Sequence, residues 1–158
     1  PMTPMPATAA VRVRRAELSD LDDLVALEEQ SFAGDRLSRA QYRRHLDSES
    51  AQVLVASANH RRFLGTAVVF FRKGSGAARL YSIATQAEAR GKGVGSALIE
   101  AAEQAARRKR RSALRLEVRT DNDAAIRLYE RLGYQRIGHY ASYYEDGADA
   151  WRYEKALD

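Results

Sequence analysis

Hydrophobic and polar residues follow two different periods along the chain. Alternating or β-branched segments predict strands over residues 11–14, 52–58, 63–71, 79–85 and 114–119, and a final hairpin over 134–140 and 148–155. Apolar residues spaced three and four apart predict helices over 21–28, 94–105 and 121–132. Ser38 and Gln41 have capping-box spacing, which predicts a further short helix through Tyr42 and Leu46.

The elements follow the order β-α-α-β-β-β-α-β-α-β-β, without internal repeats or linkers. Three successive strands favour an antiparallel section of sheet, whose first turn lies at residues 59–62. We therefore expect one mixed α/β (α+β) domain over residues 11–158, with a mostly antiparallel sheet of about seven strands and about four helices. Residues 1–10 contain three prolines and are expected to form a flexible N-terminus.

The ends of several elements carry recognisable capping residues. Ser19 or Asp20 is expected to cap the first helix, and Gly133 to end the last helix in a left-handed conformation. Asp146 and Gly147 are a strong turn pair, so they predict the turn of the final hairpin.

The composition narrows the chemistry. The 158 residues include no cysteine, which excludes disulfides, thiolate zinc sites, iron–sulfur clusters and acyl-cysteine intermediates. His45, His60 and His139 lack metal-ligand spacing, so no metal site is expected. No segment approaches the ~20 apolar residues of a spanning helix. The start has no basic stretch followed by a long apolar region, so we expect a cytoplasmic protein without membrane contact.

The charge is concentrated in one place. The formal net charge is +5, and residues 107–111, Arg-Arg-Lys-Arg-Arg, contribute five positive charges. A basic run at the end of a helix complements the negative end of the helix dipole, which makes a solvated cap the first interpretation. One alternative is a nucleic-acid-binding surface, although no aromatic residues are interleaved with the basic ones. The other is a docking surface for an acidic or ribosome-associated partner.

A glycine-rich turn precedes the third predicted helix. The segment consists of Arg90, Gly91, Lys92, Gly93, Val94, Gly95 and Ser96. Free backbone N–H groups and the positive dipole end favour an anion at such a helix start. The segment lacks Walker spacing, and Ser96 occupies the position of the third glycine of the dinucleotide motif. From the turn alone, a phosphate site and a purely connecting turn both remain open.

Arg90, Gly93 and Gly95 form the pattern R-x-x-G-x-G, which resembles the acyl-CoA motif of the GNAT superfamily of N-acetyltransferases. With the order of elements, the resemblance extends over roughly residues 11–157. It implies acetyl-CoA as the acyl donor. The strand residues Ile83, Ala84 and Thr85 would then bind the pantetheine arm, and residues 91–96 would bind the pyrophosphate.

A second motif spans the fifth strand and the last helix. By alternation, Glu117 lies on the strand face opposite Leu116 and Val118. The simpler interpretation of Glu117 is a residue that forms ion pairs on a solvated strand face, and the simpler interpretation of Tyr129 is a packing residue. However, the segments L-E-V-R-T-D-N and A-A-I-R-L-Y-E-R-L-G-Y resemble one GNAT subgroup, the bacterial N-terminal alanine acetyltransferases of a ribosomal protein. The resemblance implies that Glu117 accepts a proton, Tyr129 donates one, and Asn122 contacts coenzyme A.

These roles match what direct acetyl transfer requires. An amine attacks a thioester only in its neutral form, so a base must remove a proton. An α-amine has a pKa of roughly 8 and a lysine side chain about 10.4, which favours a peptide N-terminus as acceptor. A phenol can protonate the departing thiolate, and a strand amide near Ile83 or Ala84 can bind the oxyanion.

The acceptor site is less constrained. Three tyrosines precede the turn pair of the final hairpin: Tyr140, Tyr143 and Tyr144. The resemblance implies that this hairpin forms one wall of the peptide-binding site. The first helix and its loop, including Glu28 and Phe32, would form the other wall. Aromatic packing at a hairpin edge is the alternative for the tyrosines. Residues 31–37 depart from the subgroup pattern. Acetylation of a lysine or a small amine, and a non-catalytic acyl-CoA sensor, therefore stay open, and we expect a monomer or weak homodimer.

Overall fold

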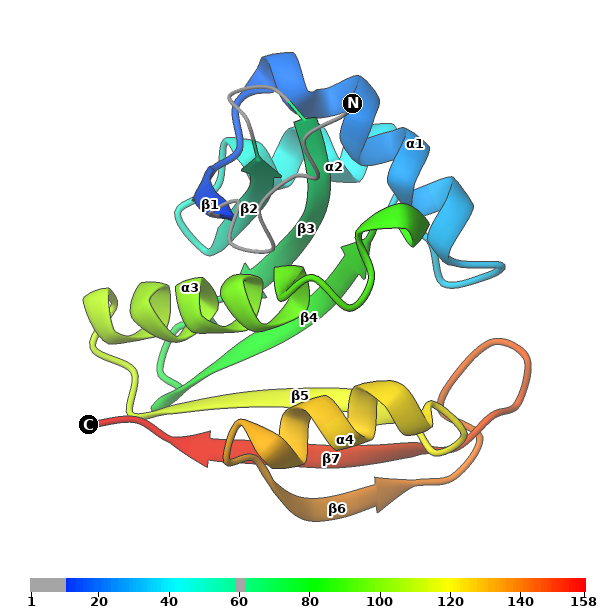
Figure 1. Ribbon diagram of the computed structural model, residues 1–158. Helices are drawn as coiled ribbons and strands as arrows, with labels where there is room; N and C mark the ends of the chain where they lie inside the picture. The colour runs from blue at the N-terminus through cyan, green and yellow to red at the C-terminus, as the bar shows by residue number, and fades with distance from the viewer. Residues whose placement is uncertain (1–10, 59–61) are drawn as a thin grey trace, which may run out of the picture.

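The computed structural model describes residues 11–58 and 62–158, which form one seven-stranded sheet and four α-helices (Figure 1). The strands are β1 (Arg12–Arg15), β2 (Ala51–Ala58), β3 (Arg62–Phe70), β4 (Ala77–Thr85), β5 (Ala113–Arg119), β6 (Gln135–Tyr140) and β7 (Ala150–Ala156). The helices are α1 (Leu21–Ser31), α2 (Arg39–Leu46), α3 (Val94–Arg108) and α4 (Asp123–Arg131). The predicted order of elements is confirmed. The expected flexible segment 1–10 and the turn residues 59–61 lie outside the described residues.

The sheet has the strand order β1-β2-β3-β4-β5-β7-β6, and every neighbouring pair is antiparallel except β4 and β5. The mixed, mostly antiparallel sheet is therefore confirmed. Residues Ala77–Leu80 of β4 pair with Ala113–Leu116 of β5, and beyond this point the two strands diverge (Figure 1). The pairing of β3 with β4 skips Tyr81, which marks a bulge where the divergence begins.

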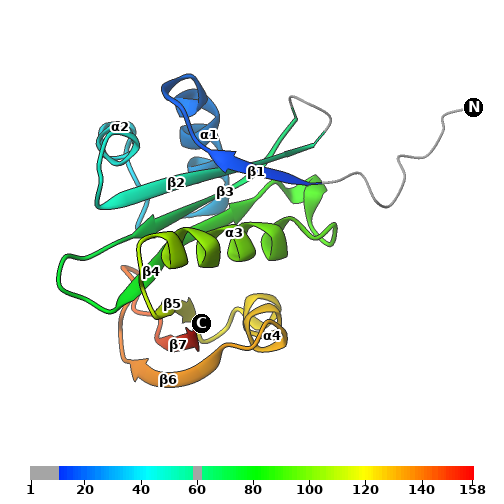
Figure 2. The same cartoon turned by 90° about the vertical axis from the view of Figure 1, so that its left-hand side faces the viewer.

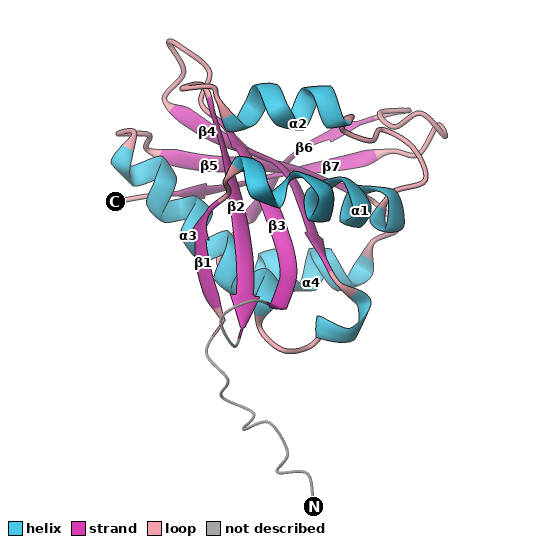
Figure 3. Cartoon of the chain, turned by 90° about the horizontal axis from the view of Figure 1, so that it is seen from above, coloured by secondary structure: helices cyan, strands magenta, loops and turns pink. Residues whose placement is uncertain are grey.

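The helices lie on both faces of the sheet, with α1 and α2 on one face and α3 and α4 on the other (Figures 2 and 3). Leu24 of α1 and Tyr42 of α2 pack on the first face, and Leu98 of α3 packs on the second, all fully buried. On β5, Leu114, Leu116 and Val118 are buried towards α3 and α4. The intervening residues of β5 therefore face the side of α1 and α2.

The capping predictions have mixed outcomes. The Ser38 capping box is confirmed, because Ser38 Oγ accepts a hydrogen bond from Gln41 N–H at 3.1 Å and Gln41 Oε1 accepts one from Ser38 N–H at 2.8 Å. Asp20 is the N-cap residue of α1, one of the two predicted positions, but its side chain makes no capping hydrogen bond to the helix. Asp20 instead accepts two hydrogen bonds from Arg14, at 2.7 and 2.8 Å, and one from Glu17 N–H, because a guanidinium lies within reach on β1.

The final hairpin forms, and its connection is two residues longer than predicted, because β7 begins at Ala150 and not at Ala148. Residues 141–149 join β6 to β7, and Asp146 and Gly147 lie in a turn within this segment, closed by a hydrogen bond from Gly147 N–H to Tyr144 O. Gly133 ends α4 with a φ of +96°, as predicted. The longer connection allows the loop to reach the α1–α2 loop.

The basic run 107–111 is partly structural. Arg110 has a φ of +56°, and the N–H groups of Arg110 and Arg111 donate to Arg107 O and Ala106 O, which closes the end of α3 as a Schellman motif. The Arg111 side chain donates to the backbone oxygens of Arg72 and Ser75. Among the described residues, no helix combines the length and the apolar composition needed to cross a bilayer.

Candidate active site

A cleft of about 1370 Å³ occupies the space between the diverging halves of β4 and β5. Its lining includes sixteen of the eighteen residues that the sequence assigned to catalysis, cofactor and substrate: Glu28, Phe32, Ile83, Ala84, Thr85, Arg90, Gly91, Gly93, Val94, Gly95, Ser96, Glu117, Asn122, Tyr129, Tyr143 and Tyr144. Lys92 and Tyr140 are the other two, and they do not line the cleft. One cavity thus joins residues that are far apart in the sequence.

The glycine-rich turn forms one end of the cleft. Gly91 and Gly93 have φ values of +79° and +81°, a conformation that costs a residue with a Cβ free energy. Gly93 is the N-cap of α3, and no acceptor in the described chain receives the N–H groups of Gly91 or residues 93–96. These free donors and the positive end of the α3 dipole make the turn suitable for a phosphate group.

The divergence of β4 from β5 leaves one edge of β4 without a partner strand. Gln86 N–H donates to Leu64 O on β3, so the backbone groups of Ala84, two residues earlier, also point towards β3. The groups of Ile83 and Thr85 then point into the cleft. Of the two amides considered for the oxyanion, the Ile83 N–H is therefore directed to the cleft and the Ala84 N–H is not.

Glu117 lies on β5 where the strands separate, and its side chain is 7% exposed. Arg79 Nε on β4 donates to Glu117 Oε1 at 2.7 Å, and Arg152 Nε on β7 lies 3.4 Å from Glu117 Oε2. Tyr143 also approaches, with its hydroxyl 3.4 Å from Oε1. The alternative of a solvated strand face does not hold, because the carboxylate is buried between two guanidinium groups.

The sequence did not reveal Arg79 and Arg152 as partners of Glu117. The only available signal was that a charged residue facing inward needs a counter-ion. That signal does not identify the partner, because the register that pairs Glu117 with Arg152 depends on the strand order. Burial lowers the pKa of Arg79, but Glu117 and Tyr143 outweigh this effect and the net shift is upward. Arg79 therefore stays charged beside the carboxylate.

Tyr129 comes from α4 and is 4% exposed, and its ring meets that of Tyr134 edge-on at 6.1 Å. Burial raises the pKa of Tyr129, with a further contribution from Tyr144. The phenol therefore keeps its proton at neutral pH. Its hydroxyl has no hydrogen-bond partner among the described side chains and backbone groups, although the residue lines the cleft.

Asn122 serves as the N-cap of α4, because its Oδ1 accepts a hydrogen bond from Ala125 N–H at 3.2 Å. This contact leaves the amide NH₂ group of Asn122 available to a ligand. Gly95 allows α3 and α4 to approach, since a Cβ at this position would lie 3.1 Å from Leu128 Cδ2. The two helix starts therefore flank the same part of the cleft.

Glu28 lines the cleft, but its carboxylate is directed into the protein. Tyr42 O–H donates to Oε1 at 2.6 Å and Leu37 N–H donates to Oε2 at 2.8 Å. Burial raises the pKa of Glu28, and these hydrogen bonds oppose the shift. Both acceptor atoms are used to hold the α1–α2 loop, so Glu28 positions that loop, while the half-buried Phe32 presents its side chain to the cleft.

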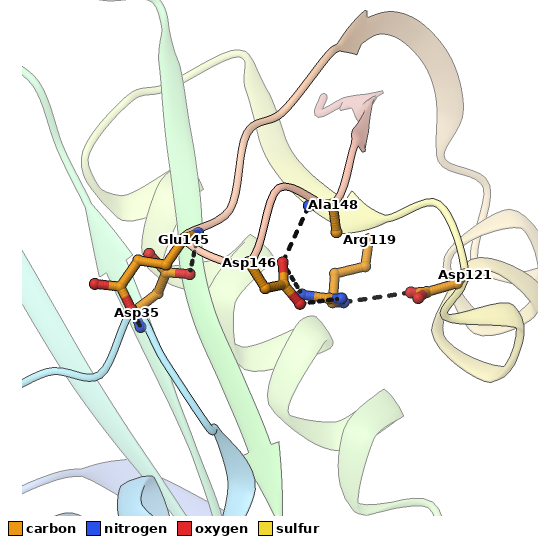
Figure 4. Close-up of polar contacts among 6 residues, drawn as sticks. All are labelled: Asp35, Arg119, Asp121, Glu145, Asp146 and Ala148. Atoms are coloured by element: carbon orange, nitrogen blue, oxygen red, sulfur yellow. Dashed lines mark hydrogen bonds and ion pairs between the residues drawn. The ribbon is translucent and has the colours of Figure 1, made fainter.

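Two loops meet across the wide end of the cleft (Figure 4). Asp35 N–H donates to Glu145 Oε2 at 3.0 Å, and Glu145 N–H donates to Asp35 Oδ2 at 3.1 Å, so each backbone amide meets the other residue's carboxylate. Arg119 binds Asp146 through both guanidinium NH₂ groups, at 2.7 and 3.2 Å. We call the reciprocal contact of Asp35 and Glu145 the loop bridge.

The described residues contain no group of three or more His, Asp or Glu side chains that could hold a metal ion. The groups in the cleft instead include backbone N–H donors, arginine side chains, the Glu117 carboxylate and several phenols. They can bind an anionic, elongated ligand, accept a proton and donate one.

Comparisons with known proteins give a consistent result. The chain is 32% identical over 141 residues to a Bacillus subtilis protein provisionally named as a [ribosomal protein bS18]-alanine N-acetyltransferase. The aligned region covers 87% of this chain and 90% of that protein. The solved ribosomal-protein-S18-alanine N-acetyltransferase from Escherichia coli superposes with a TM-score of 0.81, at 25% identity, over 94% of both chains.

Other relatives extend well beyond the region that aligns with this chain. An uncharacterized protein of Mycobacterium leprae is 35% identical over 84% of this chain, but the chain spans only 37% of that protein's length. The chain spans less than half of the length of several curated relatives. The model of the acetyltransferase (GNAT) family matches residues 18–134, which include the glycine-rich turn, Glu117 and Tyr129. The chain therefore belongs to the acetyltransferase (GNAT) family.

Proposed function

We propose that the protein transfers the acetyl group of acetyl-CoA directly to the N-terminal α-amine of a protein or peptide. The observation that carries this proposal is the single cleft that contains the free amides of Gly91 and residues 93–96, the buried Glu117 carboxylate and the Tyr129 phenol. Membership of the GNAT family and the similarity to ribosomal-protein alanine acetyltransferases support it.

The cofactor fits the chemistry of the cleft. The N–H groups of the turn and the side chain of Arg90 would hold the pyrophosphate, and the open edge of β4 at Ile83 and Thr85 would bind the pantetheine amides. Bound acetyl-CoA supplies the reactive thioester. Ile83 N–H is directed towards the cleft, where it can stabilise the oxyanion of the tetrahedral intermediate.

Glu117 is proposed as the general base. Its Oε1 accepts a hydrogen bond from Arg79, whereas no group in the described chain donates a hydrogen bond to Oε2. Oε2 can therefore take the proton of the acceptor ammonium, directly or through a water molecule. Arg79 and Arg152 would hold the carboxylate in place while it does so.

Tyr129 is proposed as the general acid. Its raised pKa keeps the phenol protonated at neutral pH, so that it can donate its proton to the departing coenzyme A thiolate. The transfer breaks the thioester C–S bond and forms the amide C–N bond. The proton lost by the amine leaves through Glu117, and no covalent intermediate on the protein is needed.

The variants Glu117→Gln and Tyr129→Phe test these roles. We expect each to lower kcat by roughly 10²- to 10⁴-fold, the usual contribution of a positioned acid or base. Binding of acetyl-CoA, measured by calorimetry, and the circular dichroism spectrum should stay unchanged, which separates lost chemistry from a lost fold. Near wild-type rates for both variants with a good substrate would show that the roles are wrongly assigned.

The choice of acceptor needs a separate measurement. Acetyl transfer is compared for peptides with a free N-terminus, N-terminally blocked peptides with an internal lysine, and polyamines. We expect the free N-termini to react fastest, because an α-amine loses its proton more readily than a lysine side chain. Faster transfer to lysine or to a polyamine would favour the second candidate, a GNAT enzyme for side-chain or small amines.

A further inference from the structure

A second cavity, of about 680 Å³, lies beside the active-site cleft and is strongly basic. It lies between the end of α2, the β3–β4 turn and the first residues of β4 and β5. The charged residues of its lining are all cationic: Arg44, Arg72, Lys73, Arg79, Arg115 and Arg152. We call this cavity the basic pocket.

Only three of these six cations have a carboxylate partner, and they share two carboxylates. Arg79 and Arg152 share Glu117, and Arg115 Nε donates to Glu154 at 2.6 Å. Arg44, Arg72 and Lys73 form no ion pair within the described residues. Such an excess in a concave site attracts an anion, because opposite charges there are less screened than on an open surface.

One donor inside this region lacks an acceptor. Arg152 Nε is buried and makes no hydrogen bond in the described chain, although it lies 3.4 Å from Glu117 Oε2. A buried N–H without an acceptor costs free energy. Because this N–H is enclosed, Arg152 contributes to the basic pocket through its charge, for which Glu117 is shared with Arg79.

The basic pocket adjoins the place where the acceptor amine reacts. Arg79 lines both cavities and contacts Glu117. Three aromatic rings in contact lie along the same path, with His45 and Phe70 centroids 5.0 Å apart and Phe70 and Tyr81 centroids 4.6 Å apart. Tyr81 also lines the cleft. Tyr81 is 38% exposed, so its ring is accessible to a bound chain.

The spacing sets which part of an acceptor reaches the basic pocket. Arg115 precedes Glu117 by two residues on the same face of β5, a separation of about 7 Å along a strand. An extended peptide advances by about 3.3 Å per residue. A peptide with its amine at Glu117 would therefore bring its second and third residues beside the basic pocket, and one of these two side chains would face the pocket, because adjacent side chains of an extended chain point to opposite sides.

We propose that the basic pocket binds a carboxylate side chain at the second or third residue of the acceptor, so that acidic N-termini are preferred substrates. The proposal rests on the α-amine acetylation proposed above. Arg44 and Lys73, which are exposed and lie outside the cleft lining, select the acceptor without taking part in the chemistry.

The test uses three peptides that begin Ala-Glu-Glu, Ala-Gln-Gln and Ala-Lys-Lys and are otherwise identical. We expect kcat/KM to be about tenfold higher for the Glu peptide than for the Gln peptide, and lowest for the Lys peptide. The double variant Arg44→Gln/Lys73→Gln should reduce the Glu-to-Gln ratio to below about threefold and leave the Gln peptide unaffected. Arg43→Gln is the matched control, since Arg43 is exposed on the same helix but lies outside the pocket lining.

Equal kcat/KM for the three peptides, or a ratio that survives in the double variant, would overturn the pocket assignment while acetylation itself stands. Direct binding of the same peptides separates the two proposals. If the Glu peptide binds best but none is acetylated, the proposed function fails and the pocket stands. If the peptides show no charge preference and a short RNA binds with dependence on Arg44 and Lys73, the pocket serves nucleic acid and the proposal is wrong.

Discussion

At the scale of single residues, the setting of Glu117 is made by side chains that are distant in sequence. Arg79 and Arg152 approach its two oxygens from the strands on either side, so the carboxylate is fixed before any substrate binds. A side chain held in this way needs no reorganisation when the amine arrives. Arg79 also lines both the cleft and the basic pocket, and Arg152 lines the basic pocket.

Asp20 predicts a pH dependence of stability. The hydrogen bonds from Arg14 and, less strongly, from Glu17 N–H lower the pKa of Asp20 in the folded state. Its stabilising contribution is therefore complete above about pH 3.9, the unfolded value, and is lost as the pH falls through the lower folded pKa. We expect Asp20→Asn to be less stable at pH 7 and to lose less stability between neutral and acid pH, as measured by urea unfolding. A parallel acid loss in both proteins would contradict this.

Arg110 offers a stabilising substitution. Its φ of +56° costs roughly 1–2 kcal/mol for a residue with a Cβ, whereas glycine adopts this conformation without strain but loses more chain entropy on folding. We expect Arg110→Gly to raise the free energy of unfolding by about 0.5–1 kcal/mol. Arg110→Ala removes the same charge but retains the Cβ, so it should give no gain. An equal effect of both substitutions would point to charge instead of backbone conformation.

At the scale of elements, the site depends on two loops that hold each other in place. Glu28 fixes the α1–α2 loop through Leu37 N–H, and the loop bridge then fixes residues 141–149 against it. Asp35 adopts a φ of +55° to make this contact. The strain indicates that the position of the loop is determined by its partner and not by local preference.

The loop bridge predicts a selective effect on the acceptor. Asp35→Ala removes the oxygen that accepts from Glu145 N–H, and we expect KM for an acceptor peptide to rise by about fivefold, the equivalent of one hydrogen bond of about 1 kcal/mol. KM for acetyl-CoA should not change. Asp35→Asn keeps an acceptor oxygen and tolerates the positive φ, so it should resemble the unaltered protein. If both variants behave alike, the bridge does not shape the acceptor site.

The local patterns of the sequence predicted the elements well, and the pairwise contacts poorly. Capping at Ser38 and the end of α4 at Gly133 depend only on residues that are close in the sequence, so the sequence was sufficient to predict them. The Asp20 carboxylate could bind either the free N–H groups at the start of α1 or the Arg14 guanidinium. It binds Arg14 because of where β1 lies, which the sequence does not reveal. Lys92 and Tyr140 show the same limit, because membership of a motif or an aromatic cluster does not determine which residues face the cleft.

At the scale of the whole molecule, the fold followed from the order of elements together with the resemblance to a family. The sequence could not predict how far β4 and β5 remain paired, although this length determines the size of the cleft. It also missed the basic pocket, whose cationic residues come from α2, the β3–β4 turn and three strands. The domain limits, the cytoplasmic location and the weakly associating or monomeric state stay predictions.

The loop bridge has a consequence for the order of chemical events. With β4 and β5 paired at the narrow end and the loop bridge at the wide end, the cleft is bounded at both ends, and its lining includes residues from the helices on both faces of the sheet. Acetyl-CoA would enter from the face of α3 and α4, and the acceptor from the face of α1 and α2, so neither blocks the other. Initial-rate plots should then intersect, as in a ternary-complex mechanism, and parallel lines would reveal a ping-pong route through an acylated protein.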